Sequence, residues 1–440
     1  MRSTAPWAHP WPWICAVYCA LLFVREVTLV AGSPFNSYPF MFSDSYDYFF
    51  EGQALAVRLQ GIVPPEFPIL RSPGYVLVQT LAHLTPRPEF VLFFVTNVFV
   101  WFFLMTPYFL TRIFGASQTA LYAVGVLFLL NPSNELFAYI LSDAQALSLM
   151  MLSTVCYLAH WQKKSETYLY LAALLALLGA LTQTYTAIPL LVYLGLDTVV
   201  RFFKTPGPLV RRIGWKAIGI VIALASAYLL VRMAWTSAIP HKATPATFSL
   251  IQLNFSNIGF YLDTWGYLVV LYSPVLVVLA LNFKAIRKTL VADPLIWRTG
   301  VIVVVFATLA FFYQWKDFRF TFTYLPLLFT IVLWLDRPAH RIARKMLVTT
   351  AVVHLLFLFV LSGGHPLDKS LQSIGVAPSS TPVFKMLRAQ PMDRGQLEGR
   401  CGNLERICPD AEFTPRTRYQ ERVFNAMKQL HANLPEESQP

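Results

Sequence analysis

The chain has 440 residues, of which 56% are hydrophobic and only 13% are charged. An average soluble domain carries about 25% charged residues, so this composition excludes an ordinary soluble enzyme. The formal net charge is +12. However, the basic residues stand mostly in short loops between apolar runs, where they set membrane topology rather than bind nucleic acid. The composition therefore predicts an all-α polytopic membrane protein with no nucleic-acid partner.

Apolar runs of about 20 residues recur along the chain and predict a bundle of spanning helices. The predicted ranges are 11–32, 89–114, 117–132, 135–160, 168–204 (two helices with a break near 182–184), 215–235, 265–283, 298–313, 320–335 and 346–362. These ranges amount to eleven spans. Arg25 and Glu26 fall in the second half of the first span, and their side chains are expected to reach toward the interface.

Two domains are expected: a transmembrane domain at 1–362 and a small polar tail at 363–440. The transmembrane domain has a first outer loop at 33–88 and a second large outer loop at 236–264. Loops rich in Lys and Arg follow the even-numbered spans, which predicts that these loops and the N-terminus are cytoplasmic. Both outer loops and the tail then lie on the extracytoplasmic side. The remaining ionisable residues converge on that side, and we look for chemistry there.

Two helical patterns in the first outer loop are too short to cross a bilayer, so we place them at the interface. The first begins at Asp44 and is expected to put Tyr48, Leu55 and Leu59 on one face. The second begins at Pro73 and is expected to end near position 84.

Asp44 is the main candidate for chemistry. Together with Asp47, three residues later, it is typical of a capping pair at a helix start, where the helix dipole favours acidic residues. Alternatively, a carboxylate held near an apolar surface can act as a general base that deprotonates an acceptor hydroxyl. The two interpretations are compatible, because a cap also fixes the position of the carboxylate.

Arg71 and Arg319 are the candidate cations. An arginine at an interface commonly reaches out to water, but its fork of donors also matches the oxygens of a lipid-linked phosphate. Asp143 lies about two turns into the predicted 135–160 helix, where a carboxylate is costly unless it is paired or faces a cavity. Lys242 is a loop residue of the second outer loop, with no sharper signal than solvation.

The five cysteines fall into two groups. Cys15, Cys19 and Cys156 lie in apolar runs and are expected to be small core residues. Cys401 and Cys408 lie in the polar tail, where they form either a disulfide in an oxidising space or two free thiols. No CxxC or HExxH motif indicates a metal site.

The first outer loop carries a recognisable set of residues, namely Asp44-Ser45, Tyr48, Ala54, Gly61 and Arg71-Ser72-Pro73-Gly74-Tyr75. Looser matches follow at Asn131-Pro132, Ser142-Asp143 and Arg319 before Pro326. This set resembles the first-loop signature of GT-C glycosyltransferases, which include the protein O-mannosyltransferases and the aminoarabinose transferase of lipid A. The resemblance covers residues 11–335.

The resemblance implies a GT-C-like helical bundle with a catalytic first outer loop. It gives Asp44 the position of the catalytic base. It gives Arg71 the position of the cation that binds the donor phosphate, with Arg319 as a second candidate. Secondary candidates for the site are Asp47, Tyr48, Tyr75, Asp143 and Lys242. The implied donor is a polyprenyl-phosphate sugar, transferred with inversion to a lipid, glycan or protein acceptor. The implied location is the periplasmic face of a bacterial inner membrane. No other cofactor is implied, and metal dependence stays open.

Three positions depart from the family pattern. Ser72 stands where relatives usually have proline, Asp47 replaces a residue that is basic in the aminoarabinose transferases, and Gln183 stands where many relatives have arginine. These departures leave the sugar and the activity open. Two other classes therefore remain: a lipid or glycan transporter or flippase, and an inactive scaffold with the same fold.

Overall fold

The computed structural model describes a largely helical bundle. The described residues are 9–31, 43–61, 71–129, 142–204, 206, 214–238, 287, 294–312, 325–335, 348 and 352. Within them the elements are α1 (Pro10–Ala31), α2 (Ser43–Leu59), α3 (Pro73–His83), α4 (Pro88–Phe114), α5 (Gln118–Leu129), α6 (Asp143–Lys163), α7 (Glu166–Thr182), the 3₁₀ helix η4 (Thr184–Ala187), α8 (Ile188–Lys204), α10 (Trp215–Ala238), α13 (Pro294–Phe312) and α15 (Leu325–Leu335). Every regular element in the described part of the chain is helical, as the composition predicts.

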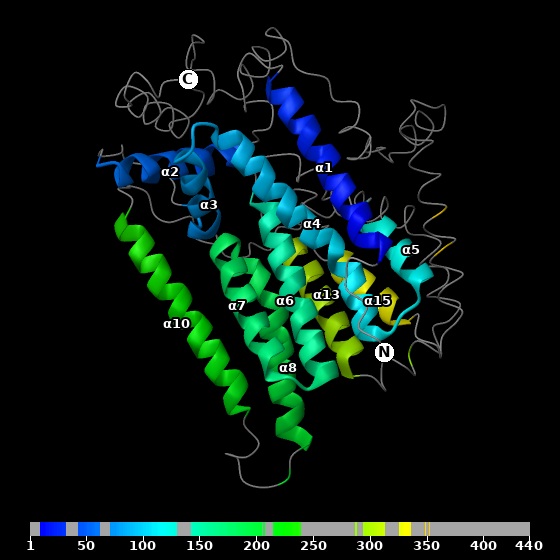
Figure 1. The fold of residues 1–440 in the computed structure, drawn as a ribbon. Helices are drawn as coiled ribbons and strands as arrows, with labels where there is room; N and C mark the ends of the chain where they lie inside the picture. Colours follow the sequence, from blue (N-terminus) through cyan, green and yellow to red (C-terminus); the bar gives the residue numbers. More distant parts are fainter. Residues whose placement is uncertain are drawn as a thin grey trace.

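Four of these helices are long and apolar enough to cross a membrane: 10–28 in α1, 90–114 in α4, 184–203 through η4 and α8, and 215–237 in α10. Helix α6 lies in the centre of the bundle, where α4, α7 and α8 pack around it (Figure 1). It is buried over nearly its whole length, and its buried face includes several polar residues. A helix enclosed by protein can carry polar side chains that a lipid-facing helix cannot, because its neighbours satisfy them.

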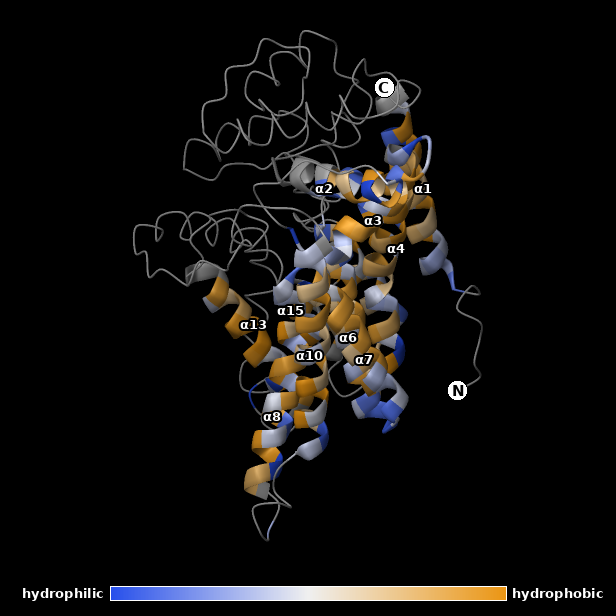
Figure 2. Cartoon of the chain, turned by 90° about the vertical axis from the view of Figure 1, so that its left-hand side faces the viewer, coloured by the Kyte–Doolittle hydropathy of each residue, from blue (hydrophilic) through white to orange (hydrophobic). Residues whose placement is uncertain are grey.

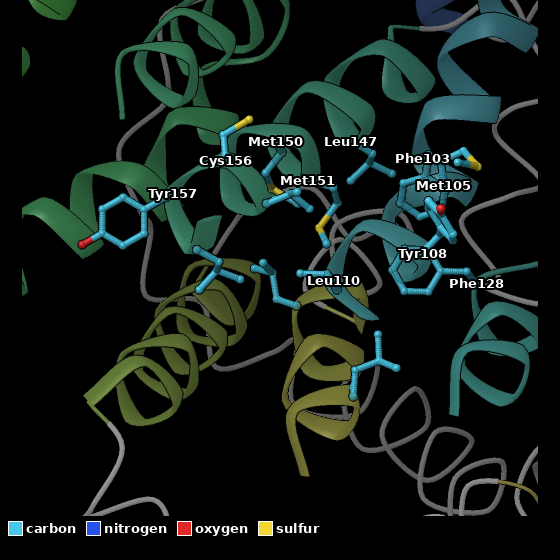
Figure 3. Close-up of a cluster of buried hydrophobic side chains, with 14 of the residues drawn as sticks. Phe103, Met105, Tyr108, Leu110, Phe128, Leu147, Met150, Met151, Cys156 and Tyr157 are labelled. Atoms are coloured by element: carbon cyan, nitrogen blue, oxygen red, sulfur yellow. The ribbon is translucent and has the colours of Figure 1, made fainter. Parts of the chain in front are cut away.

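The core is built mainly by α4, α5 and α6 (Figure 3). Phe103 of α4 packs against Phe128 of α5, with ring centroids 5.1 Å apart. Helix α1 joins this core through Trp11, whose indole nitrogen donates to the carbonyl of Leu104 at 3.0 Å. The ring of Trp11 lies so close to Gly125 that an added Cβ there would meet it at 2.1 Å. Gly125 therefore allows α1 and α5 to approach each other around this tryptophan.

The two short helices of the first loop lie across one end of the bundle (Figures 1 and 2). Helices α2 and α3 pack on each other, and α3 also packs on α4, α7 and α10. We call this the α2–α3 end. At the opposite end, where α4, α6 and α8 finish and α7 and α10 begin, several basic residues are exposed. They are Arg112, Lys163, Lys164, Arg201 and Lys216.

Most predicted helix ranges within the described residues are confirmed to within a few positions, including the break after Thr182. The prediction for Glu26 is wrong: its side chain is 1% exposed and accepts a hydrogen bond from Asn97 Nδ2 at 2.7 Å, inside the α1–α4 contact. Leu59 does not share a buried face with Tyr48, because it is 66% exposed. Asp143 is the first residue of α6, not two turns inside a helix. The predicted span 265–283, nearly all of the span 346–362 and the tail lie outside the described residues.

Candidate active site

Two glycines bring the elements of the α2–α3 end into close contact. A Cβ on Gly52 of α2 would lie 2.3 Å from Gln79 Cβ of α3, and a Cβ on Gly74 would lie 2.7 Å from Thr182 Oγ1 at the end of α7. Only a residue without a side chain fits at such positions. These contacts place the start of α3 against the end of α7, and the middle of α3 against α2. Gly74 belongs to the sequence motif of the first loop, and here its role is close packing.

Arg71, just before α3, is held on three sides. Its backbone N–H donates to both carboxylate oxygens of Glu51, at 2.8 and 3.0 Å. Its carbonyl oxygen accepts from Trp235 Nε1 at 3.1 Å and from Arg232 Nη1 at 3.4 Å, both on α10. Its guanidinium carbon lies 5.4 Å from the centroid of the Tyr48 ring, within cation–π range. The structure thus fixes the backbone of a predicted phosphate-binding residue and rests its cation on an aromatic face.

Tyr48 connects Arg71 to the central helix of the bundle. Its hydroxyl accepts from Ser142 Oγ at 3.1 Å and from Gln183 Nε2 at 3.4 Å. Gln183 Nε2 also donates to Ser142 Oγ at 2.7 Å. The edge of Tyr48 meets the ring of Tyr75, with centroids 5.2 Å apart in a T-shaped arrangement. These contacts bring together α2, α3, the start of α6 and the break after α7.

Asp143 lies next to this network, directly after Ser142. Its side chain is buried in the first turn of α6. Negative charge at a helix N-terminus is favoured by the backbone dipoles, which offsets part of the cost of burial. Two residues after Asp143, Gln145 Nε2 donates to Thr182 Oγ1 at the end of α7, at 2.9 Å. The α2–α3 end therefore holds a largely buried polar cluster, although apolar spans surround it. We call Tyr48, Glu51, Arg71, Ser142, Asp143 and Gln183 the loop cluster.

Asp44 and Asp47 lie in the first turns of α2, and their side chains are outside the described residues. At 3.6 residues per turn, positions 44, 48 and 51 follow the i, i+4, i+7 spacing of a single helix face. Tyr48 and Glu51, which share that face, both contact Arg71. Position 47 falls about 60° to one side of position 44.

Burial also affects two ionisable groups of α3. It raises the pKa of the Tyr75 hydroxyl well above its usual range. It lowers the pKa of His83 to about 4, because the ring is desolvated next to Phe49, with centroids 4.3 Å apart. At neutral pH the last turn of α3 therefore carries no charge from His83. No group of three or more His, Cys, Asp or Glu residues in the described part of the chain is arranged to hold a metal ion.

The structure brings together Arg71, Tyr48, Tyr75 and Asp143 among the residues predicted from sequence. Arg319, Lys242, Cys401 and Cys408 lie outside the described residues. Sequence reasoning missed Glu51, Arg232 and Trp235. It noted Ser142 only as part of a loose family match and Gln183 only as a departure from the family pattern. The helical spacing of Glu51 from Tyr48 was the one available signal. The contacts of Arg232 and Trp235 with Arg71 join residues more than 160 positions apart, and no local pattern reveals them.

The arrangement is that of an all-α integral membrane protein, which carries a largely buried polar cluster under its first loop. Among solved structures the chain is similar to the crystal structure of ArnT from Cupriavidus metallidurans bound to undecaprenyl phosphate. The match has a TM-score of 0.50 at 13% identity and covers 96% of this chain and 76% of that one. At this identity the likeness shows the fold alone. No protein-family model and no curated protein sequence matches the chain.

Proposed function

We propose that this chain is a membrane glycosyltransferase that uses a polyprenyl-phosphate-linked sugar as donor. The observation that carries the proposal is Arg71, whose backbone is held by Glu51 and Trp235 and whose guanidinium lies over Tyr48. An arginine fixed in this way offers its fork of donors to a phosphate at the end of the bundle. The GT-C fold adds support, because the similar ArnT structure has undecaprenyl phosphate bound.

In the proposed reaction Asp44 is the general base. It takes the proton of an acceptor hydroxyl as the hydroxyl oxygen forms a bond to sugar C1. The bond between C1 and the phosphate oxygen breaks on the opposite side of the sugar, so the configuration inverts and polyprenyl phosphate leaves. Arg71 neutralises the charge that grows on the leaving phosphate. The acceptor is a lipid, a glycan or a protein.

Asp44 is proposed for this role on the basis of its register in α2. It stands one turn before Tyr48 on the helical face that holds Arg71, whereas Asp47 stands at the edge of that face. Tyr75 and Asp143 border the same cluster, and we propose that they shape its polar surroundings. Arg319 remains proposed as a second cation for the donor phosphate, and Lys242 as a secondary residue of the site.

The topology proposed with this function places the α2–α3 end on the extracytoplasmic side of a bacterial inner membrane. The exposed basic residues at the opposite end support it, because cytoplasmic loops are enriched in Lys and Arg. Residues 1–362 form the catalytic membrane domain in this proposal, with about eleven spans, and residues 363–440 an extracytoplasmic tail that a Cys401–Cys408 disulfide stabilises.

A transfer assay with purified protein and radiolabelled polyprenyl-phosphate sugars tests the proposal. A set of donors with different sugars is incubated with cell-envelope lipids and peptidic acceptors, and both labelled product and released polyprenyl phosphate are measured. We expect product with at least one donor. Translocation of donor across proteoliposomes without release of polyprenyl phosphate would instead identify a flippase. Binding of donor with neither event would identify an inactive scaffold.

A further inference from the structure

Two glutamates in the described part of the chain are almost completely buried, and they do different things. Glu26 of α1 is 1% exposed and accepts from the side chain of Asn97, in a contact between two helices. Glu51 of α2 is 0% exposed and accepts from a backbone N–H, that of Arg71. Burying a carboxylate is costly unless hydrogen bonds replace those lost to water. Both oxygens of Glu51 accept from the N–H of Arg71, and the role of Glu51 is therefore to be explained from that contact.

The geometry around Arg71 supplies that explanation. We infer that Glu51 is a positioning residue, which fixes the peptide of Arg71 so that its guanidinium stands ready for the lipid phosphate. This inference rests on the proposed function for the phosphate, while the contact itself does not. Glu51 holds the N–H side of the residue and Trp235 holds the carbonyl side, so the backbone of Arg71 is fixed between α2 and α10.

Tyr48 and Glu51 act on Arg71 from the same face of α2. They are three residues apart, which places their side chains one above the other on a helix. Tyr48 supports the cation, and Glu51 supports the backbone that carries it. Gly52, directly after Glu51, allows α3 to approach α2 closely enough for this contact. A charged acceptor makes a stronger hydrogen bond than a neutral one, which favours a glutamate at this position.

Holding the backbone of an arginine in place raises its affinity for an anion. A free side chain loses conformational freedom when it binds, and a prearranged one loses less. Removing Glu51 leaves the N–H of Arg71 without this acceptor and releases the segment before α3. The expected result is a weaker phosphate site in a protein that still contains Arg71. Glu51 acts through Arg71 in this scheme and does not touch the reacting atoms.

The experiment compares Glu51→Leu, which removes the acceptor, with Glu51→Gln, which keeps one acceptor oxygen. Affinity for undecaprenyl phosphate is measured by native mass spectrometry of the full-length protein in detergent. We expect Glu51→Leu to weaken binding roughly 10–100-fold, and Glu51→Gln to weaken it less. In the Arg71→Ala background, Glu51→Leu should add less than about twofold, because a residue acting through Arg71 loses its effect when that side chain is absent.

Glu26→Gln is the matched control. It removes the other buried carboxylate but leaves the surroundings of Arg71 unchanged, so its affinity for undecaprenyl phosphate should equal that of the unmodified protein. In a transfer assay, Glu51→Leu should raise the donor KM more than it lowers kcat. A general loss of structure would reduce the active fraction without changing KM. Equal effects of Glu51→Leu with and without Arg71 would overturn the inference.

Hydrogen exchange of the ligand-free protein tests the role of Glu51 separately from the proposed donor. The amide of Arg71 should exchange slowly in the unmodified protein, faster in Glu51→Leu and at an intermediate rate in Glu51→Gln. Equal exchange in the three proteins would disprove the positioning role, whatever the activity. Slow exchange together with no binding of undecaprenyl phosphate would disprove the proposed donor and leave the role of Glu51 in fixing Arg71 standing.

Discussion

The loop cluster has a counterpart at the opposite end of the bundle, which also combines an arginine, a carboxylate and aromatic rings. There Arg298 of α13, 1% exposed, forms an ion pair with Asp197 of α8, and its guanidinium lies 4.6 Å from the ring centroid of Trp161. Trp161 Nε1 donates to Asp197 at 3.2 Å, and the Tyr157 hydroxyl donates to the same carboxylate. We call these four residues the α13 cluster.

The two clusters use similar residues in different ways. In the α13 cluster the carboxylate binds the guanidinium directly, so the charges neutralise each other and join α6, α8 and α13. In the loop cluster the carboxylate of Glu51 binds the backbone of Arg71, and the guanidinium lies over Tyr48. The comparison teaches that an arginine beside an aromatic ring does not by itself mark a site. The carboxylate of the α13 cluster holds the guanidinium itself, whereas Glu51 holds the backbone of Arg71, and this difference agrees with the role proposed for Arg71.

The comparison predicts that changes in the loop region affect transfer, and that changes in the α13 cluster affect stability. The largest effect is expected for Asp44→Asn. Asn has nearly the size of Asp and loses only the favourable interaction of a negative charge with the first turn of α2, so the variant should fold and bind donor. Loss of the base should slow transfer by roughly 10²–10⁴-fold in the radiolabelled-sugar assay.

Asp47→Asn is the control for this prediction, because position 47 lies at the edge of the helical face. It should reduce transfer less than Asp44→Asn. Unchanged turnover in Asp44→Asn, or a larger loss in Asp47→Asn, would show that Asp44 is not the base.

The second effect is expected for Arg71→Ala. Loss of a desolvated contact with phosphate should weaken donor binding by about 2–5 kcal/mol. Arg71→Lys should impair binding less than Arg71→Ala, since it keeps the charge but loses the bidentate fork. Native mass spectrometry with undecaprenyl phosphate measures both. Neither variant should lower the melting temperature as much as a change in the α13 cluster does. Normal donor affinity in Arg71→Ala would show that Arg71 does not bind the donor phosphate.

Much of the contrast between the two clusters could not be predicted from the sequence, because it depends on contacts between distant residues. The helix ranges and the break after Thr182 follow from local hydropathy and from residue spacing, which act within one segment. The motif from Arg71 to Tyr75 is local as well. By contrast, Arg298 was predicted only as the first residue of a span, because its partner Asp197 is 101 positions earlier in the chain. Glu26 was misassigned for the same reason: its partner Asn97 lies on another helix.

The third effect concerns the α13 cluster and its contribution to stability. Asp197→Asn leaves Arg298 buried without its carboxylate, and breaking a fully buried pair costs about 3–5 kcal/mol. We expect a smaller loss of stability here, because the side chain of Asp197 is 26% exposed. A thermal-unfolding assay in detergent should show a lower midpoint, while the folded variant keeps its affinity for undecaprenyl phosphate. A tenfold loss of that affinity would contradict the distinction between the two clusters.

The smallest effect concerns pH and belongs to the α2–α3 end alone. Burial lowers the pKa of His83 to about 4, whereas a histidine in the unfolded chain has a pKa near 6.5. Between these values the unfolded chain binds more protons than the folded one, so the free energy of unfolding falls as the pH drops from about 6.5 to about 4. Below about 4 both states are protonated, and this contribution changes no further.

His83→Gln tests this contribution. The variant should have a lower midpoint of thermal unfolding at neutral pH, because it loses the contact with Phe49. Its midpoint should depend less on pH, because glutamine does not titrate. Thermal unfolding of both proteins at several pH values measures the difference, and hydrogen exchange should locate it in α2 and α3. Equal slopes for the two proteins would show that His83 is not responsible.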